Sequence, residues 1–216
     1  MDAPAQTGAH AGRDARPASA ARSRDGRIAV WDPFVRIFHW SLLTLFVVAY
    51  LTHDLSETIH QGAGYGIAVL VVLRVVWGLV GSRHARFRDF VYRPTAVLRF
   101  LIATARFKAP RHVGHNPAGG AMVLALLLNI AVICGSGIMM TMDRFWGQKW
   151  IEEVHETAVH VCIGLIVLHV LGVIAASLEH RENLVRSMVT GWKRGPAAPA
   201  GEQRSIEPTG PSEPAP

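Results

Sequence analysis

The sequence predicts an all-α integral membrane protein, built as a bundle of four transmembrane helices. Three observations support this prediction. Half of the 216 residues are hydrophobic, the hydrophobic residues gather in four long blocks, and the segments that separate the blocks alternate between basic and non-basic.

The four apolar blocks are long enough to cross a bilayer as helices. They span residues 34–52, 63–80, 119–141 and 157–178, which is 19, 18, 23 and 22 residues. A helix needs about 20 predominantly apolar residues to cross the hydrocarbon core. The blocks contain almost no charge and show no polar face, whereas the helices of a soluble four-helix bundle each have one.

The two ends of the chain differ in composition from the blocks. The N-terminal residues are rich in Ala, Arg, Gly and Ser, and they lack the apolar stretch of a secretory signal peptide. The last 22 residues repeat Pro, Gly and Glu, a composition typical of unstructured segments. We therefore expect disordered cytoplasmic tails at residues 1–29 and 195–216, and a transmembrane domain at residues 30–194.

Lys and Arg residues predict the orientation in the membrane. Six of them stand at or before residue 36, eight stand between residues 81 and 118, and five follow residue 178. Residues 53–62 contain none, and residues 142–156 contain two against four acidic residues. Basic segments remain in the cytoplasm. We therefore expect both termini and the long middle segment on the cytoplasmic side, with two short loops outside.

The same rule accounts for the net charge of +6 without any nucleic-acid partner. The basic segment has no regular pattern of stacking aromatics, which single-stranded nucleic acid would require. Within it, residues 93–107 are expected to form an interfacial helix. Pro94 suits the first helical position, apolar residues recur at helical spacing from Val97 to Ile102, and Arg99 and Arg106 can reach lipid phosphate.

Several of the eleven histidines fall within or beside the apolar blocks, where an ionisable side chain needs a partner and indicates function. His155 and His160 are five residues apart, not the four of the zinc-protease motif H-E-x-x-H. Five residues turn a helix by about 140°, so the two rings cannot share one metal. His169 follows His155 by fourteen residues, which places both on nearly one face about 21 Å apart. We assign His160 to packing or an interface, and give His84 no role.

Partner histidines can be sought on other helices at matching depths in the membrane. This search gives two pairs. His39 matches His169 near the cytoplasmic surface, and we call these two residues the inner pair. His60 matches His155 near the opposite surface, and we call them the outer pair. His53 is fourteen residues after His39, so spacing alone would also allow it as an outer ligand. We prefer His60, because it begins a helix that fixes its direction.

A haem suits two paired imidazoles better than zinc does. Zinc takes four protein ligands, or three and a water, and no Cys or carboxylate cluster would complete the set. A haem needs only two axial ligands, and its flat apolar ring packs between helices.

No C-x-x-C-H motif is present, which excludes a covalent c-type haem. Cys134 and Cys162 are expected to be buried thiols. Seven glycines near the proposed sites would leave room for the ring, or would instead allow close helix packing: Gly62, Gly64, Gly66, Gly135, Gly137, Gly164 and Gly172.

Arg74 lies inside the second apolar block, fourteen residues after His60. It is therefore expected on the same face as His60, at the depth of the inner pair. A guanidinium binds a carboxylate through two hydrogen bonds, so Arg74 could pair with a haem propionate. The alternative is that its side chain reaches the cytoplasmic headgroups.

Several segments together resemble a known family: WDPFVRIFHW, HQGAGY, LRVVWGLVGSRHARFRDF, GHNPAGGAMVLALLL, EEVHE, LHVLGV and HRENLVRSMVTGWKR. Over residues 30–194 the chain resembles the bacterial cytochrome b561 family, which includes the b-type cytochrome subunits of membrane-bound nickel–iron hydrogenases. The resemblance implies four transmembrane helices in the bacterial inner membrane and two non-covalent haem b groups. It places the iron ligands on His39, His60, His155 and His169. The chain departs from the family pattern at Gly62, where relatives often have an aromatic residue. The departure affects the expected packing around the outer haem, not its ligand.

Iron with two histidine ligands has no open position for oxygen or substrate, so the expected function is electron transfer. We expect electrons to pass between a quinone pool or dehydrogenase and a redox partner protein: a hydrogenase, another dehydrogenase or a c-type cytochrome. The alternative is a subunit that anchors a periplasmic hydrogenase or c-type cytochrome complex. No iron–sulfur motif or nucleotide fingerprint is present, so we expect no catalytic residues and no stand-alone enzyme. A histidine-based metal or proton transporter would favour internal repeats and mid-depth carboxylates, which the sequence lacks. A homodimer is left open.

Overall fold

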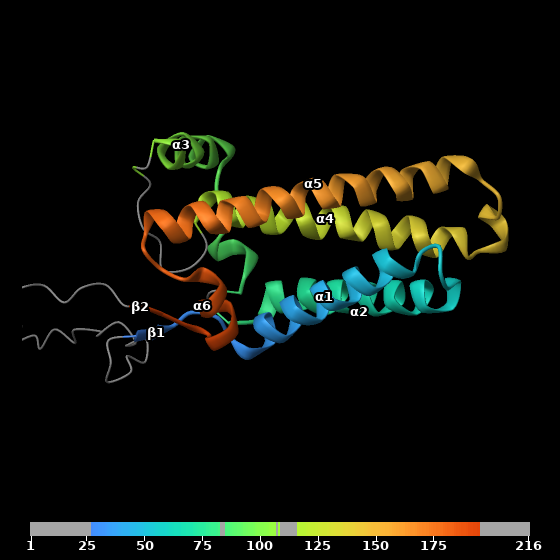
Figure 1. The fold of residues 1–216 in the computed structure, drawn as a ribbon, viewed down its shortest axis with the longest axis horizontal. Helices are drawn as coiled ribbons and strands as arrows, with labels where there is room; N and C mark the ends of the chain where they lie inside the picture. The colour runs from blue at the N-terminus through green and yellow to red at the C-terminus, as the bar shows by residue number, and fades with distance from the viewer. Residues whose placement is uncertain (1–26, 83–84, 107, 109–115, 195–216) are drawn as a thin grey trace, which may run out of the picture.

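Four long helices form the body of the protein (Figure 1). The computed structural model describes residues 27–82, 85–106, 108 and 116–194. All four long helices have the length and the apolar composition needed to cross a membrane: α1 (Pro33–Thr52), α2 (Glu57–Val80), α4 (Pro117–Met140) and α5 (Lys149–Glu179). The predicted all-α membrane bundle is confirmed.

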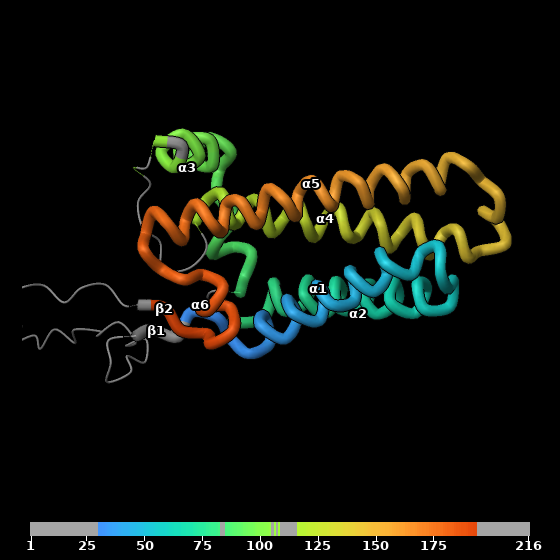
Figure 2. The backbone as a smooth tube through the Cα atoms, viewed as in Figure 1, coloured from blue at the N-terminus to red at the C-terminus, as the bar shows by residue number. Residues whose placement is uncertain are grey.

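The long helices pack as two hairpins, α1 with α2 and α4 with α5 (Figure 2). Contacts between α2 and α4 join the hairpins, whereas α1 and α5 are not an extensively packed pair. The core lies where α2, α4 and α5 meet and contains the buried residues Ile67, Val71, Ile130 and Cys162. Many apolar side chains elsewhere on these helices are exposed, for example Leu128 at 70%. A soluble protein rarely exposes such continuous apolar surface, whereas lipid would cover it.

The two ends of the bundle differ. At one end, called here the loop end, residues 53–56 join α1 to α2, and a short loop containing η2 (Asp143–Phe145) joins α4 to α5. At the other end, called the terminal end, lie the smaller elements: β1 (Arg27–Ala29), η1 (Phe87–Asp89), α3 (Pro94–Ala105), α6 (Leu184–Thr190) and β2 (Trp192–Arg194). Both ends of the described chain therefore lie on the side of the long middle segment, as the charge alternation requires.

A two-stranded antiparallel sheet closes the terminal end. β1 pairs with β2, with Arg27 opposite Arg194. The amides of Val30 and Trp31 donate to the Gly191 carbonyl, 3.0 and 3.2 Å away. This corrects the expected tail boundary at residue 29, because residues 27–29 belong to the folded part through pairing with a distant segment. The expected tails at residues 1–26 and 195–216 lie outside the described residues.

Polar side chains cap the helices at their first residues. Asp32 accepts the Val35 amide at 2.8 Å and precedes Pro33, the first residue of α1. Asn116 caps α4 in the same way, with a 2.6 Å bond from the Gly119 amide. A capping side chain accepts from an amide that has no partner within the helix, and contributes about 1 kcal/mol. These caps fix where α1 and α4 begin.

Two helices, α2 and α5, begin well before their apolar blocks. α2 starts at Glu57 and α5 at Lys149, whereas the blocks start at residues 63 and 157. The 31 residues of α5 make a helix of about 46 Å, longer than the roughly 30 Å hydrocarbon core. His155 therefore lies in the second turn of α5 and not at its start. The segment that is expected to be interfacial does form a helix, α3.

Candidate functional site

His60 and His155 face each other at the loop end of the bundle. The centroids of their rings are 6.2 Å apart, and the ring planes meet at 71°. A metal-bound imidazole nitrogen lies about 2 Å from the metal and the ring centroid about 1 Å farther, so two axial imidazoles have centroids roughly 6 Å apart. The separation of the outer pair therefore fits two imidazoles on one metal.

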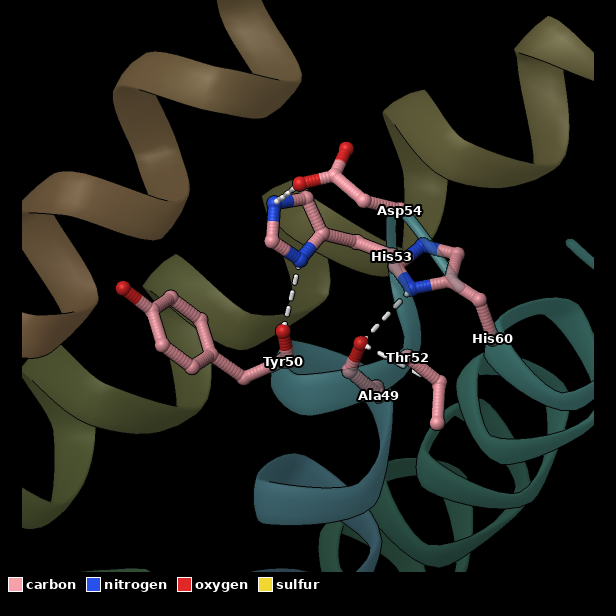
Figure 3. Close-up of polar contacts among 6 residues, drawn as sticks. All are labelled: Ala49, Tyr50, Thr52, His53, Asp54 and His60. Carbon is pink, nitrogen blue, oxygen red and sulfur yellow. Dashed lines mark hydrogen bonds and ion pairs between the residues drawn. The ribbon is translucent and has the colours of Figure 1, made fainter. Parts of the chain in front are cut away.

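Backbone carbonyls fix the proton on both rings of the outer pair. His60 Nδ1 lies 2.9 Å from the Ala49 carbonyl of α1 (Figure 3), and His155 Nδ1 lies 3.0 Å from the Ile133 carbonyl of α4. A carbonyl can only accept, so each Nδ1 must carry the hydrogen. The Nε2 atom of each ring then keeps its lone pair, which is the form in which histidine binds a metal.

Two residues of α4 also lie against the His155 ring. The Ser136 hydroxyl is 3.1 Å from His155 Nδ1. A Cβ atom added to Gly137 would stand 3.3 Å from His155 Cε1, which is a tight contact. Sequence reasoning assigned no role to Ser136, although a polar side chain inside an apolar block was the signal that could have marked it.

His39 and His169 are less closely joined. No hydrogen bond or ring stacking joins these two side chains in the described part of the chain. His39 stands edge-on to Trp40, with ring centroids 5.3 Å apart. Its Nδ1 atom is buried and has no hydrogen-bond partner within the described part of the chain. A buried imidazole nitrogen without a partner requires an explanation, and a ligand that binds the ring would provide one.

The open spacing of the inner pair follows from the packing. His39 belongs to α1 and His169 to α5, two helices without an extensive mutual contact. A Cβ atom added to Gly62, Gly64, Gly164 or Gly172 would meet nothing within 4 Å, and Gly62, Gly164 and Gly172 are exposed. These glycines therefore make no close helix contact. The residues present fit a flat group that needs two axial imidazoles.

Arg74 is buried at the terminal end of α2, with only 2% of its surface exposed. One terminal nitrogen, Nη2, donates to the Ala85 carbonyl at 3.2 Å, and the guanidinium lies 5.1 Å from the centre of the Phe87 ring. The other, Nη1, is buried without a partner among the described residues. The segment around η1 covers Arg74.

Asp32 gathers three hydrogen bonds beside Arg74. Its carboxylate accepts from the Val35 amide, from Trp77 Nε1 at 3.2 Å and from the Ser82 hydroxyl. Burial alone raises the pKa of this carboxyl, but the hydrogen bonds from Ser82, Val35 and Trp77 outweigh it. The charge of Arg74 acts in the same direction, and the pKa of Asp32 lies below its ordinary value. Asp32 thus joins the start of α1 to the end of α2.

The other histidines do not join either pair. Both ring nitrogens of His53 are engaged: Nδ1 donates to the Tyr50 carbonyl at 2.7 Å, and Nε2 lies 2.9 Å from Asp54 (Figure 3). His160 is exposed, and its Nδ1 lies 2.9 Å from the Glu156 carbonyl of its own helix. His84 lies outside the described residues. No group of three or more His, Cys, Asp or Glu side chains that could hold a metal ion exists in the described ranges.

Comparison with known proteins identifies the family. The family model of prokaryotic cytochrome b561 matches residues 30–191. A probable Ni/Fe-hydrogenase B-type cytochrome subunit of Bradyrhizobium diazoefficiens is 25% identical, over 77% of this chain and 86% of that protein. Proteins with the same description from Rhizobium leguminosarum bv. viciae and Azotobacter vinelandii are 24% and 23% identical, over 76% and 77% of this chain and 87% and 88% of their own. No solved structure matches the chain. The match over residues 30–191 shows that the chain belongs to the prokaryotic cytochrome b561 family.

Proposed function

We propose that the chain binds two haem b groups, one between His60 and His155 and the other between His39 and His169. The observation that supports this most directly is the outer pair, with ring centroids 6.2 Å apart and each Nδ1 bound to a backbone carbonyl. Membership of the family makes the chain a multi-pass bacterial membrane protein and a b-type cytochrome that works in electron transfer. The number of haems and their ligands are the proposal.

A bound haem b, held by a pair of histidines, would supply one-electron chemistry. The residues of this chain do the rest. The outer pair is held in one tautomer by the carbonyls of Ala49 and Ile133. The buried core of Ile67, Val71 and Ile130 lies between the depths of the two pairs and excludes water there. A preorganised apolar surrounding of this kind changes little when a single charge is added or removed.

The two sites would stand near opposite surfaces of the membrane. His155 and His169 are both on α5 and fourteen residues apart, which is about 21 Å along the axis. The hydrocarbon core is about 30 Å thick. An electron that moves between the two sites would therefore cross most of the bilayer.

Arg74 is the proposed partner of an inner haem propionate. Its Nη1 atom is buried and lacks a partner in the described part of the chain, while Nη2 is bound to Ala85. A buried guanidinium with a free donor is a strong site for a carboxylate. The 2% exposure of Arg74 counts against the headgroup alternative.

The proposed partners are a membrane quinone and a hydrogenase or similar redox protein. The relatives are described as probable Ni/Fe-hydrogenase cytochrome subunits, which supports a hydrogenase as the protein partner. An anchoring role for a periplasmic hydrogenase or a c-type cytochrome complex is the alternative form of the same proposal. Both require rapid oxidation or reduction of the bound haems by a quinone or quinol in membranes, and stopped-flow absorbance measures this directly. A homodimer is compatible with the proposal and not required by it.

We further propose that the terminal end of the bundle faces the cytoplasm. Basic residues gather in the segments at that end, and the loops at the other end contain few. Alkaline phosphatase fused after residue 194 should be inactive, whereas phosphatase inserted at residue 54 should be active. The reverse pattern would refute this orientation.

The haem content of purified protein tests the proposed function. A pyridine haemochrome assay should give two haem b groups per chain, extractable by acid acetone because they are not covalently bound. The reduced protein should show the sharp absorption of a six-coordinate haem. One haem per chain would leave only one of the two histidine pairs as a site, and none would refute the proposal.

A further inference from the structure

Helix α4 surrounds one edge of the His155 ring with two hydrogen-bonding groups. The Ile133 carbonyl lies 3.0 Å from His155 Nδ1, and the Ser136 hydroxyl lies 3.1 Å from the same atom. Residues three apart share one face of a helix, which is why both groups meet the ring. Ser136 is only 6% exposed, so water does not compete for its hydroxyl.

The single hydroxyl proton of Ser136 is used within α4. The hydroxyl donates to the Val132 carbonyl at 2.8 Å, with the Ile133 carbonyl 3.1 Å away. This back-bond to the preceding turn is usual for serine in a helix. Because His155 Nδ1 carries its own hydrogen, the serine oxygen meets that N–H with a lone pair. The N–H of His155 is therefore shared between two acceptors.

The outer pair is asymmetric as a result. For His60 Nδ1 the hydrogen bond is to one acceptor, the Ala49 carbonyl at 2.9 Å. His155 has a carbonyl and a hydroxyl together. An acceptor at the second nitrogen of a metal-bound histidine increases the basicity of the first and strengthens its bond to the more positive metal. His155 is thus the stronger donor of the two ligands.

We propose that Ser136 is a positioning residue that lowers the midpoint potential of the outer haem by accepting the His155 Nδ1–H. The inference rests on the proposed function, since it requires a haem iron on His155. A second effect follows from the same contact. Two acceptors on α4 hold the imidazole plane more firmly than one, so Ser136 also fixes the rotation of the ring.

The competing interpretation is that Ser136 only satisfies its own helix. A serine that bonds Val132 would then matter for the packing of α4, and not for the electronic state of His155. Two measurements separate these roles: the midpoint potential of the outer haem and the electron paramagnetic resonance spectrum of its oxidised form. A packing role alone would change neither of them.

The experiment compares three variants of the full-length protein in detergent with both haems bound. Ser136→Ala removes the hydroxyl, and Ser136→Thr keeps it. Asn129→Ala is the matched control, because Asn129 also lies on α4 and donates to the α5 carbonyl of Ala158 at 2.9 Å without touching His155. A redox titration of each variant gives the two midpoint potentials.

Ser136→Ala should raise the outer potential and leave the inner one unchanged. Loss of one acceptor should change the relative binding of the oxidised and reduced forms by roughly two- to tenfold, which is about 20 to 60 mV. The resonance spectrum of the outer haem should broaden as the ring gains rotational freedom. Ser136→Thr should restore both values, and Asn129→Ala should change neither.

An unchanged outer potential in Ser136→Ala, or an equal shift in Asn129→Ala, would overturn the inference. If Ser136→Ala lost the outer haem while Ser136→Thr kept it, the hydroxyl would still be the required group and the inference would stand. Loss from both would mean that the position serves packing, and would overturn it. These outcomes are distinct from failure of the proposed function, which would show as wild-type protein without haem or as His155→Ala with its outer haem intact.

Discussion

The ring of His60 in α2 is bound to the carbonyl of Ala49, in the last turn of α1, by a 2.9 Å hydrogen bond. The last carbonyls of a helix have no amide partner within it, so they are free to accept from elsewhere. The hairpin between α1 and α2 thus supplies the group that orients a proposed metal ligand. Thr52 also reaches Ala49, at 3.5 Å (Figure 3).

The four proposed ligands should separate into two independent sites. His60→Ala or His155→Ala should remove the outer haem, and His39→Ala or His169→Ala should remove the inner one. Each variant should therefore contain one haem per chain, measured by the pyridine haemochrome assay. The reason is that each pair belongs to a different depth of the bundle, about 21 Å apart on α5.

Two other histidines provide the controls for this experiment. His53→Ala and His160→Ala should retain two haems, because these side chains are bound to Tyr50, Asp54 and Glu156 outside both pairs. Loss of a haem from His160→Ala, with none lost from His155→Ala, would contradict the assignment.

Replacement of Arg74 should lower the potential of the inner haem. Arg74→Gln removes a positive charge that favours the reduced, less positive centre. At an effective dielectric of about 20 and a separation of roughly 10 Å, the lost interaction is about 1.7 kcal/mol. For one electron this is about 70 mV, and a redox titration measures it.

Arg74→Lys keeps the charge and should recover most of that potential, although it cannot reproduce the bond to Ala85 and the contact with Phe87 together. Equal shifts of both haems in Arg74→Gln would indicate a general structural effect instead.

A side chain at position 137 should disturb the outer site. Gly137→Val would place carbon atoms against the His155 ring, since even a Cβ would stand 3.3 Å from Cε1. We expect reduced outer haem content at growth temperature, measured by difference spectroscopy. Gly135→Val is the matched control on the same helix, about 200° away, where a Cβ meets nothing within 4 Å. Equal haem loss in both variants would show that the effect is not specific to His155.

Asp32 should stabilise the fold at neutral pH and lose this effect in acid. Its pKa is lower in the folded protein than in the unfolded chain, because hydrogen bonds and Arg74 favour the charged form over the cost of burial. The stabilisation is complete above the unfolded pKa, near 4, and disappears as the pH falls through the folded value. Asp32→Asn keeps the helix cap without the charge, so its melting temperature should be lower than the wild-type value at pH 7 and approach it near pH 3.

Asp32→Ala should be less stable than Asp32→Asn at every pH, by about 1 kcal/mol in the free energy of unfolding, because it also loses the cap. Wild-type and Asp32→Asn melting temperatures that differ by the same amount at all pH values would refute the role of the charge.

Sequence periodicity and depth were sufficient to predict the four helices and to bring His60 to His155, because membrane thickness restricts where each residue can lie. The contact of Ser136 with His155 could not be predicted in this way, since it depends on the rotation of α4 against α5. The cover over Arg74 depends on how the segment around η1 folds back. The early start of α5 was missed because polar residues such as Glu152 and Glu153 form a helix readily but do not count as apolar. Strands of three residues such as β1 and β2 are too short to show a hydrophobic pattern in the sequence. They form because each pairs with a segment far away in the chain.

The pairing of β1 with β2 has a consequence for the order of assembly. Arg36, one turn before His39, donates to the Val189 carbonyl of α6, and β1 has no strand to pair with until β2 has been made. The start of α1 therefore lacks the contacts of Arg36 and β1 until nearly the last described residues have been made. We expect the outer site to be ready for its haem on the nascent chain, and the inner site to be filled later. A chain that stops at residue 182 should consequently retain the outer haem and lack the inner one, and the same haem content as the full-length protein would disprove this order.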